Sequence, residues 1–86
     1  MLLGTMEIAD KVRSFITTNF YVADPSRLEE ETSLLDSGVI DSTGVLEVIS
    51  FIEGEFGVEV ADEEMRPDNL DSIGRIARFI QQKKSL

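Results

Sequence analysis

The sequence predicts an all-α fold, a small four-helix bundle with three longer helices, one short helix and a long loop between the first two. Two observations carry this prediction. Apolar residues recur with the helical period of 3.6 in three separate segments, and glycine, proline and capping residues stand where those segments end. The chain has 86 residues and no internal repeat, so we expect a single domain over residues 1–86.

The first helix is expected over residues 6–19, with Thr5 as its cap. Its apolar positions repeat at i, i+4, i+7 and i+8, which places them on one face of a helix. These positions are Ile8, Val12, Phe15 and Ile16. Asn19, followed by aromatic and β-branched residues, marks the end of this helix.

A long connection follows over residues 21–41. Asp24-Pro25-Ser26 has the cap-then-proline pattern of a short helical turn. Gly38 is a candidate for a turn that needs a positive φ. Such a loop must be held down by apolar contacts, for which we expect Leu28, Leu34, Leu35, Val39 and Ile40.

The second helix is expected over residues 42–56 and ends before Gly57, a favourable residue just past a helix C-terminus. Asp41 and Ser42 both favour the N-cap position, so the Ser42 hydroxyl would lie at the positive end of the helix dipole, near free N–H groups. A phosphate on that oxygen would be well placed. The expected core stripe is Val45, Val48, Ile49, Ile52 and Phe56. The opposite, solvent-facing side holds Thr43, Glu47, Ser50 and Gly54, with Leu46 and Phe51 toward its edges.

The last third of the chain contains a short helix and a longer one. Val58 and Val60 are expected to face inward from an extended segment. Asp62 is the expected cap of a brief helix over residues 63–66, which Pro67 would end. The final helix carries the stripe Ile73, Ile76, Ala77 and Ile80 and has two lysines in its last turn.

Composition excludes several classes of function. The chain has no cysteine and no histidine, so it is poorly equipped for nucleophilic catalysis or zinc binding, and we expect no catalytic residues and no enzyme activity. Clustered carboxylates lack the spacing of a calcium loop, so no metal site is expected. No apolar run approaches the length of a membrane span. A monomeric protein of the cytoplasm is the resulting expectation.

Charge is distributed unevenly along the chain. The net charge is −9, and residues 22–68 hold two basic against fourteen acidic residues. This acidic middle section surrounds Ser42 and its helix. It argues against nucleic acid as a ligand and favours partners with basic surfaces.

These features together resemble an acyl carrier protein. The resemblance lies in the run Leu34-Leu35-Asp36-Ser37-Gly38-Val39-Ile40-Asp41-Ser42, the acidic helix after it, the segment from Glu55 to Val60, and Asp62-Glu63-Glu64. It extends over nearly the whole chain and implies the same helical fold. In that family the serine of an Asp-Ser-Leu motif carries 4'-phosphopantetheine, and Ser42, flanked by Asp41 and Thr43, occupies the matching position.

The resemblance also implies partners. A phosphopantetheinyl transferase would attach the arm from coenzyme A with Mg²⁺, and the arm's thiol would hold an acyl group as a thioester. Acyl-loading ligases or synthase enzymes of fatty-acid, polyketide or modified-lipid synthesis would then use it. The expected partner-binding residues are Leu46, Glu47, Ser50, Glu53 and Asp36, which would face basic docking surfaces.

The chain departs from the family pattern on this helix. Thr43 replaces the usual leucine, Ser50 replaces an apolar contact residue, and Gly44 and Gly54 stand where acids are frequent. These differences suggest a specialised carrier rather than one serving general fatty-acid synthesis. Two alternatives remain open: an aminoacyl or peptidyl carrier of the D-alanyl or nonribosomal-peptide type, and an unmodified helical adaptor that binds partners through the acidic face.

Overall fold

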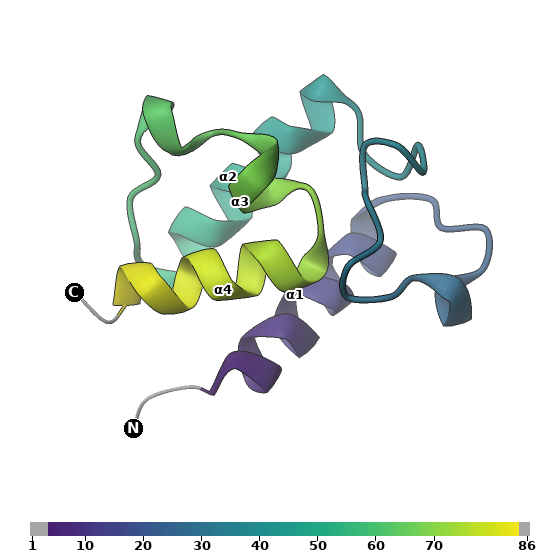
Figure 1. The fold of residues 1–86 in the computed structure, drawn as a ribbon, viewed down its shortest axis with the longest axis horizontal. Helices are drawn as coiled ribbons and strands as arrows, with labels where there is room; N and C mark the ends of the chain where they lie inside the picture. Colours follow the sequence, from purple (N-terminus) through teal and green to yellow (C-terminus); the bar gives the residue numbers. More distant parts are fainter. Residues whose placement is uncertain (1–3, 85–86) are drawn as a thin grey trace.

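A computed structural model describes residues 4–84 of the chain. Its helices are α1 (Thr5–Asn19), α2 (Ser42–Phe56), α3 (Pro67–Leu70) and α4 (Ile73–Lys84), with single 3₁₀ turns at Pro25–Arg27 and Asp62–Glu64 (Figure 1). Every regular element within residues 4–84 is a helix. The all-α prediction of three longer helices, one short helix and a long loop between α1 and α2 is therefore confirmed.

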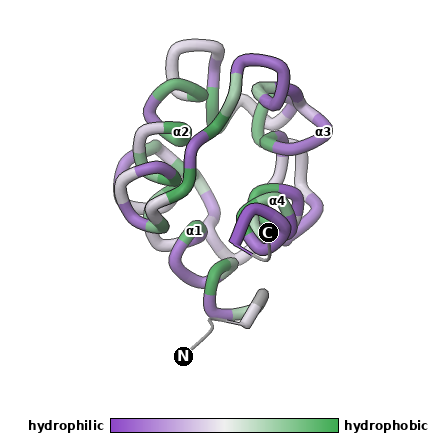
Figure 2. Tube along the Cα trace, turned by 90° about the vertical axis from the view of Figure 1, so that its left-hand side faces the viewer, coloured by the Kyte–Doolittle hydropathy of each residue, from purple (hydrophilic) through white to green (hydrophobic). Residues whose placement is uncertain are grey.

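The core forms where the four helices face one another. Helix α4 packs against both α1 and α3. Seen nearly along α4, α1 and α2 lie on one side of the molecule, and α3 and α4 on the other (Figure 2). Most of the predicted stripe residues are buried, and burial of such side chains is the main favourable term in folding. The buried members are Ile8, Val12, Ile16, Val48, Ile49, Ile52, Phe56, Ile73, Ile76, Ala77 and Ile80. Two stripe residues, Phe15 and Val45, are only half-buried.

The predicted ends of two helices are wrong. Helix α1 begins at Thr5, so its N-cap is Gly4. Pro67 does not end a helix over residues 63–66; it is the first residue of α3, and Arg66 before it is extended. The physical reason is that proline lacks an N–H, which the first helical position does not need, and its fixed φ suits that position. The residues expected in the short helix form the 3₁₀ turn Asp62–Glu64 instead, with Ala61 rather than Asp62 as its N-cap.

The long connection between α1 and α2 is held down largely as expected. Leu28, Leu34 and Ile40 are buried, and Val39 packs partly against the core. Gly38 has the positive φ predicted for it, +78°. Leu35 is an exception, because its side chain is 38% exposed. Leu34 is the residue that packs into the core here, and the side chain of the adjacent Leu35 points toward solvent.

Polar contacts fasten the same connection to the junction between α3 and α4. The Leu34 N–H donates to the Asp71 carbonyl oxygen at 2.7 Å, and the Leu35 N–H donates to Asp71 Oδ1 at 2.9 Å. Ser33 Oγ donates to the other carboxylate oxygen of Asp71 at 2.6 Å. Asp71 thus satisfies two loop N–H groups and one hydroxyl, which fixes the segment that leads to α2.

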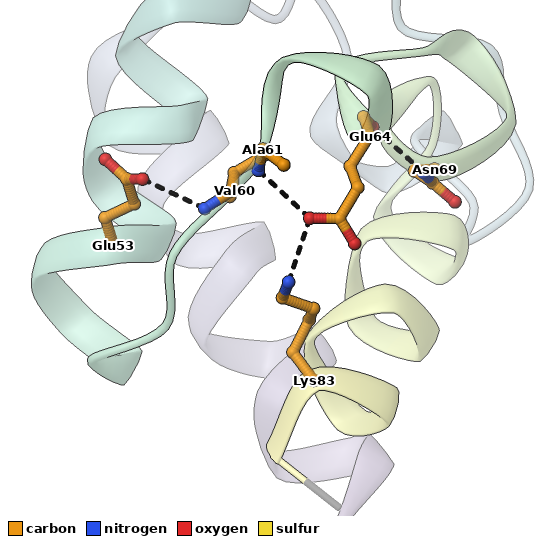
Figure 3. Close-up of polar contacts among 6 residues, drawn as sticks. All are labelled: Glu53, Val60, Ala61, Glu64, Asn69 and Lys83. Carbon is orange, nitrogen blue, oxygen red and sulfur yellow. Dashed lines mark hydrogen bonds and ion pairs between the residues drawn. The ribbon is translucent and has the colours of Figure 1, made fainter. Parts of the chain in front are cut away.

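The segment between α2 and α4 is held by two glutamates (Figure 3). Glu53 Oε2 accepts from the Val60 N–H at 3.0 Å. Glu64 Oε1 accepts from the Ala61 N–H at 3.0 Å and from Lys83 Nζ at 2.8 Å. The hydrogen bond from Lys83, supported by the one from Ala61, lowers the pKa of the Glu64 carboxyl. Val60 is buried as predicted, and Val58 is half-buried.

Candidate functional site

The first turn of α2 places Ser42 at the helix start, one residue inside its cap. Asp41 is the N-cap: its backbone is extended, and its Oδ1 accepts from the Gly44 N–H at 2.7 Å. Asp41 and Ser42 were both candidates for this position, and the structure gives it to Asp41. Ser42 is exposed, and its hydroxyl makes no hydrogen bond to any other residue in the range 4–84. The hydroxyl is therefore accessible to another molecule.

The backbone N–H groups beside this hydroxyl are available as well. Of the four N–H groups that a helix start leaves without helical partners, Gly44 donates to the Asp41 side chain and Val45 donates to the Asp41 carbonyl oxygen at 3.1 Å. Those of Ser42 and Thr43 have no acceptor within residues 4–84. Two unpaired N–H groups and the positive end of the α2 dipole suit an anionic group attached to Ser42, such as a phosphodiester.

Gly44 fixes this turn against the end of α1. It is buried, and a Cβ on it would lie 2.9 Å from Phe20 Cε1 and 3.0 Å from Ile40 Cγ2. Only a residue without a side chain lets Phe20 pack this close to α2. The sequence analysis counted Gly44 among the positions of α2 where an acid is frequent in the family. Because Gly44 is buried, it does not belong to the exposed face of α2. The sequence showed the glycine, but its contact with Phe20 depends on tertiary structure.

The partner-binding residues predicted from the sequence fall into two groups. Three of them, Leu46, Glu47 and Ser50, are exposed and line one hollow of about 490 Å³ together with Thr43, Phe15 and Phe51. The side chain of Leu46 is 61% exposed. Phe15 comes from α1, and its place beside this face was missed because its spacing assigned it to the core.

The remaining two predicted residues lie apart from this hollow. Asp36 is exposed in the long connection. Glu53 is exposed too, but its carboxylate already holds the Val60 N–H. Glu55, another acid of α2, forms an ion pair with Lys11 at 3.4 Å. By contrast, Glu47 has no hydrogen bond or ion pair within the described residues.

The described part of the chain offers neither a metal centre nor a membrane span. Between residues 4 and 84, no group of three or more acidic side chains is arranged to hold a metal ion. None of the helices in this range has the length and apolar character needed to cross a membrane.

Comparison with known proteins identifies the family that shares this arrangement. Residues 10–80 match the family model described as "Phosphopantetheine attachment site". An acyl carrier protein from Thermotoga maritima is 34% identical over 77 residues, which cover 90% of this chain and 91% of that protein. Both matches include the long connection, the Asp41-Ser42 pair and α2.

Proposed function

Because this chain belongs to the acyl carrier protein family, we propose that its Ser42 hydroxyl is the point at which 4'-phosphopantetheine is attached. Members of this family are carriers and not enzymes, and their covalently bound phosphopantetheine supplies the thiol that holds an acyl group as a thioester. The observation that supports Ser42 most directly is its position: an exposed hydroxyl at the first residue of α2, beside two unpaired N–H groups.

The surrounding residues prepare Ser42 for modification without activating it. The Asp41 carboxylate is occupied by the Gly44 N–H, and the chain contains no histidine that could act as a base. The proton of the hydroxyl must therefore be removed by a separate enzyme, the phosphopantetheinyl transferase. The contribution of this chain is to hold the hydroxyl toward solvent and to place N–H groups where the phosphate will lie.

Partner enzymes are proposed to dock on the exposed side of α2, at Thr43, Leu46, Glu47 and Ser50. Glu47, which has no partner within the described residues, is the acid best placed to meet a lysine or arginine. Asp36 would add a second contact from the long connection. Such charges raise association rates more than they raise affinity, and salt weakens them. A docking role for Glu53 stays a prediction, since its carboxylate has an intramolecular partner.

The client pathway is proposed to be a specialised one within fatty-acid, polyketide or modified-lipid synthesis. Thr43, Ser50 and Gly54 are all exposed, so α2 presents a more polar and less acidic face than the family pattern. A dedicated acyl-loading ligase or synthase with a basic docking surface fits that face. We place this activity in the cytoplasm and expect the carrier to act as a monomer.

Intact-protein mass spectrometry tests the attachment site. The purified chain is incubated with coenzyme A, Mg²⁺ and a broad-specificity phosphopantetheinyl transferase. Wild type and Ser50→Ala, the matched control on another exposed serine of α2, should each gain one phosphopantetheine. Ser42→Ala should gain none. A gain in Ser42→Ala would refute the assignment.

A second variant shows how to interpret the assay if wild type is not modified. If folded wild type gains no mass, the assay is repeated on Thr43→Leu, which restores the family's usual residue. A gain in that variant alone would support Ser42 as the site and show that Thr43 demands a dedicated transferase. No gain in either folded protein would contradict the attachment proposal and favour the unmodified adaptor.

A further inference from the structure

One acidic residue joins the long connection to the opposite side of the molecule. Asp71 lies between α3 and α4, at the point where the connection passes their junction (Figure 1). Both of its carboxylate oxygens are used: Oδ1 accepts from the Leu35 N–H, and Oδ2 accepts from Ser33 Oγ. Its carbonyl oxygen accepts from the Leu34 N–H. Three consecutive residues of the connection are therefore bound to a single residue of the junction.

The segment bound to Asp71 in turn supports the start of α2. The Leu34 side chain is buried, and its carbonyl oxygen accepts from the Ile40 N–H at 3.1 Å. Ile40 packs against the first turn of α2, where its Cγ2 would lie 3.0 Å from a Cβ at Gly44. A continuous series of contacts therefore runs from Asp71 through Leu34 and Ile40 to the turn that carries Ser42.

Two other attachments hold the connection earlier in the chain. The Gly74 N–H donates to the Glu30 carbonyl oxygen at 2.7 Å, and Arg78 forms an ion pair with Glu31 at 3.0 Å. Both lie before the segment that supports α2, and the ion pair joins two exposed side chains, where such pairs contribute little. Asp71 is half-buried and is the acceptor for a backbone N–H and a hydroxyl, which its removal would leave unpaired. The position of the supporting segment therefore depends mainly on Asp71.

We propose that Asp71 is a positioning residue for the modification of Ser42, because it holds the start of α2 in the arrangement that a phosphopantetheinyl transferase binds. The proposal rests on attachment at Ser42. Without the Asp71 side chain, only a fraction of the molecules would keep this arrangement. The apparent affinity of the transferase falls by that fraction, whereas the complex, once formed, reacts at the same rate. The expected signature is a raised KM for the carrier with an unchanged kcat.

Steady-state rates of phosphopantetheine transfer test this, measured against carrier concentration at a temperature where circular dichroism shows each variant folded. The background is wild type, or Thr43→Leu if only that variant is modified. Asp71→Ala should raise KM about fivefold, as expected if about a fifth of the molecules stay competent, and should leave kcat within about twofold. Asp71→Asn should restore most of the lost affinity, since its amide can still accept from the Leu35 N–H and can donate to Ser33 Oγ.

Two control variants separate positioning from loss of stability or charge. Asp68→Ala removes a neighbouring exposed acid whose carboxylate has no hydrogen bond or ion pair within residues 4–84, and it should keep the original KM. Ile80→Val removes a methyl group from the buried face of α4 and should lower stability without changing KM. Hydrogen exchange provides a second readout: in Asp71→Ala the Ile40 N–H should exchange faster, whereas the Ile52 N–H inside α2 should not.

Ser33→Ala tests the same contact from its other side. It removes the hydroxyl that binds Asp71 and should raise KM, and in the double variant with Asp71→Ala the two effects should be less than additive. An original KM in folded Asp71→Ala, or an equal rise of KM in Ile80→Val, would overturn the proposal. If Asp71→Ala does not fold, an original KM in Ser33→Ala would overturn it. Loading of Ser42→Ala, seen by mass, would instead refute the attachment site.

Discussion

The contact between Gly44 and Phe20 makes a quantitative prediction, because α2 holds a second glycine in a different environment. A Cβ at Gly44 would lie 2.9 Å from Phe20 Cε1 and 3.0 Å from Ile40 Cγ2, whereas a Cβ at Gly54 would meet nothing within 4 Å. The same substitution in the same helix should therefore have opposite effects on stability.

The magnitudes follow from two opposing terms. Replacing a helical glycine by alanine gains up to about 1 kcal/mol in backbone entropy. Forcing a methyl group into a filled contact costs about 1–3 kcal/mol. Gly54→Ala should then raise the free energy of unfolding by about 0.5–1 kcal/mol. Gly44→Ala should lower it by about 0–2 kcal/mol, and the difference between the two variants isolates the cost of the contact with Phe20 and Ile40.

Urea unfolding followed by far-ultraviolet circular dichroism measures both values, and thermal unfolding checks them, since each kcal/mol moves Tm by about 4–8 °C in a domain of this size. Gly44→Ala should also slow phosphopantetheine transfer, because a displaced Phe20 shifts the turn that presents Ser42. If both variants were stabilised equally, Gly44 would not be a contact glycine, and our account of how the turn is positioned would be wrong.

Three further predictions concern the acids of the chain. Asp41→Ala should lower the free energy of unfolding by about 1 kcal/mol through loss of the N-cap, and Asp41→Asn should lower it much less. Equal losses of unfolding free energy in urea titrations of the two variants would argue against capping. Glu53→Ala should lower the free energy of unfolding by about 1 kcal/mol, because it removes the acceptor of the Val60 N–H. Glu47→Ala should leave stability unchanged and should slow association with a partner enzyme, measured by stopped flow at low salt. The reverse pattern would assign the docking role to Glu53. The lowered pKa of Glu64 means that its stabilising effect is complete above the ordinary pKa of a glutamate carboxyl and is lost as pH falls through the lower folded value. The stability difference between wild type and Lys83→Met should therefore shrink in acid, and a difference that stayed constant to pH 2 would contradict this ion pair.

Local signals in the sequence were sufficient for most of the fold and for the place of Ser42 at the start of α2. The periodic stripes of α1, α2 and α4 lie in the core because a 3.6-residue period puts them on one face, whatever the helices pack against. Asp41, Ser42 and Gly57 mark the two ends of α2 through backbone chemistry that acts within a few residues. The same local rules failed at Pro67, where a proline suits a helix start as well as a helix end.

Contacts between separate structural elements decided the rest. The sequence could not show that Glu53 would bind the Val60 N–H, that Gly44 would lie under Phe20, or that Phe15 would stack on Phe51. Each of these pairings joins residues from different elements, and its geometry depends on how those elements pack. Spacing along the chain determines which face a residue occupies, but only packing determines what that face meets. That is why the position of Ser42 at the start of α2 was predicted from the sequence, whereas the hollow beside it was found in the folded structure.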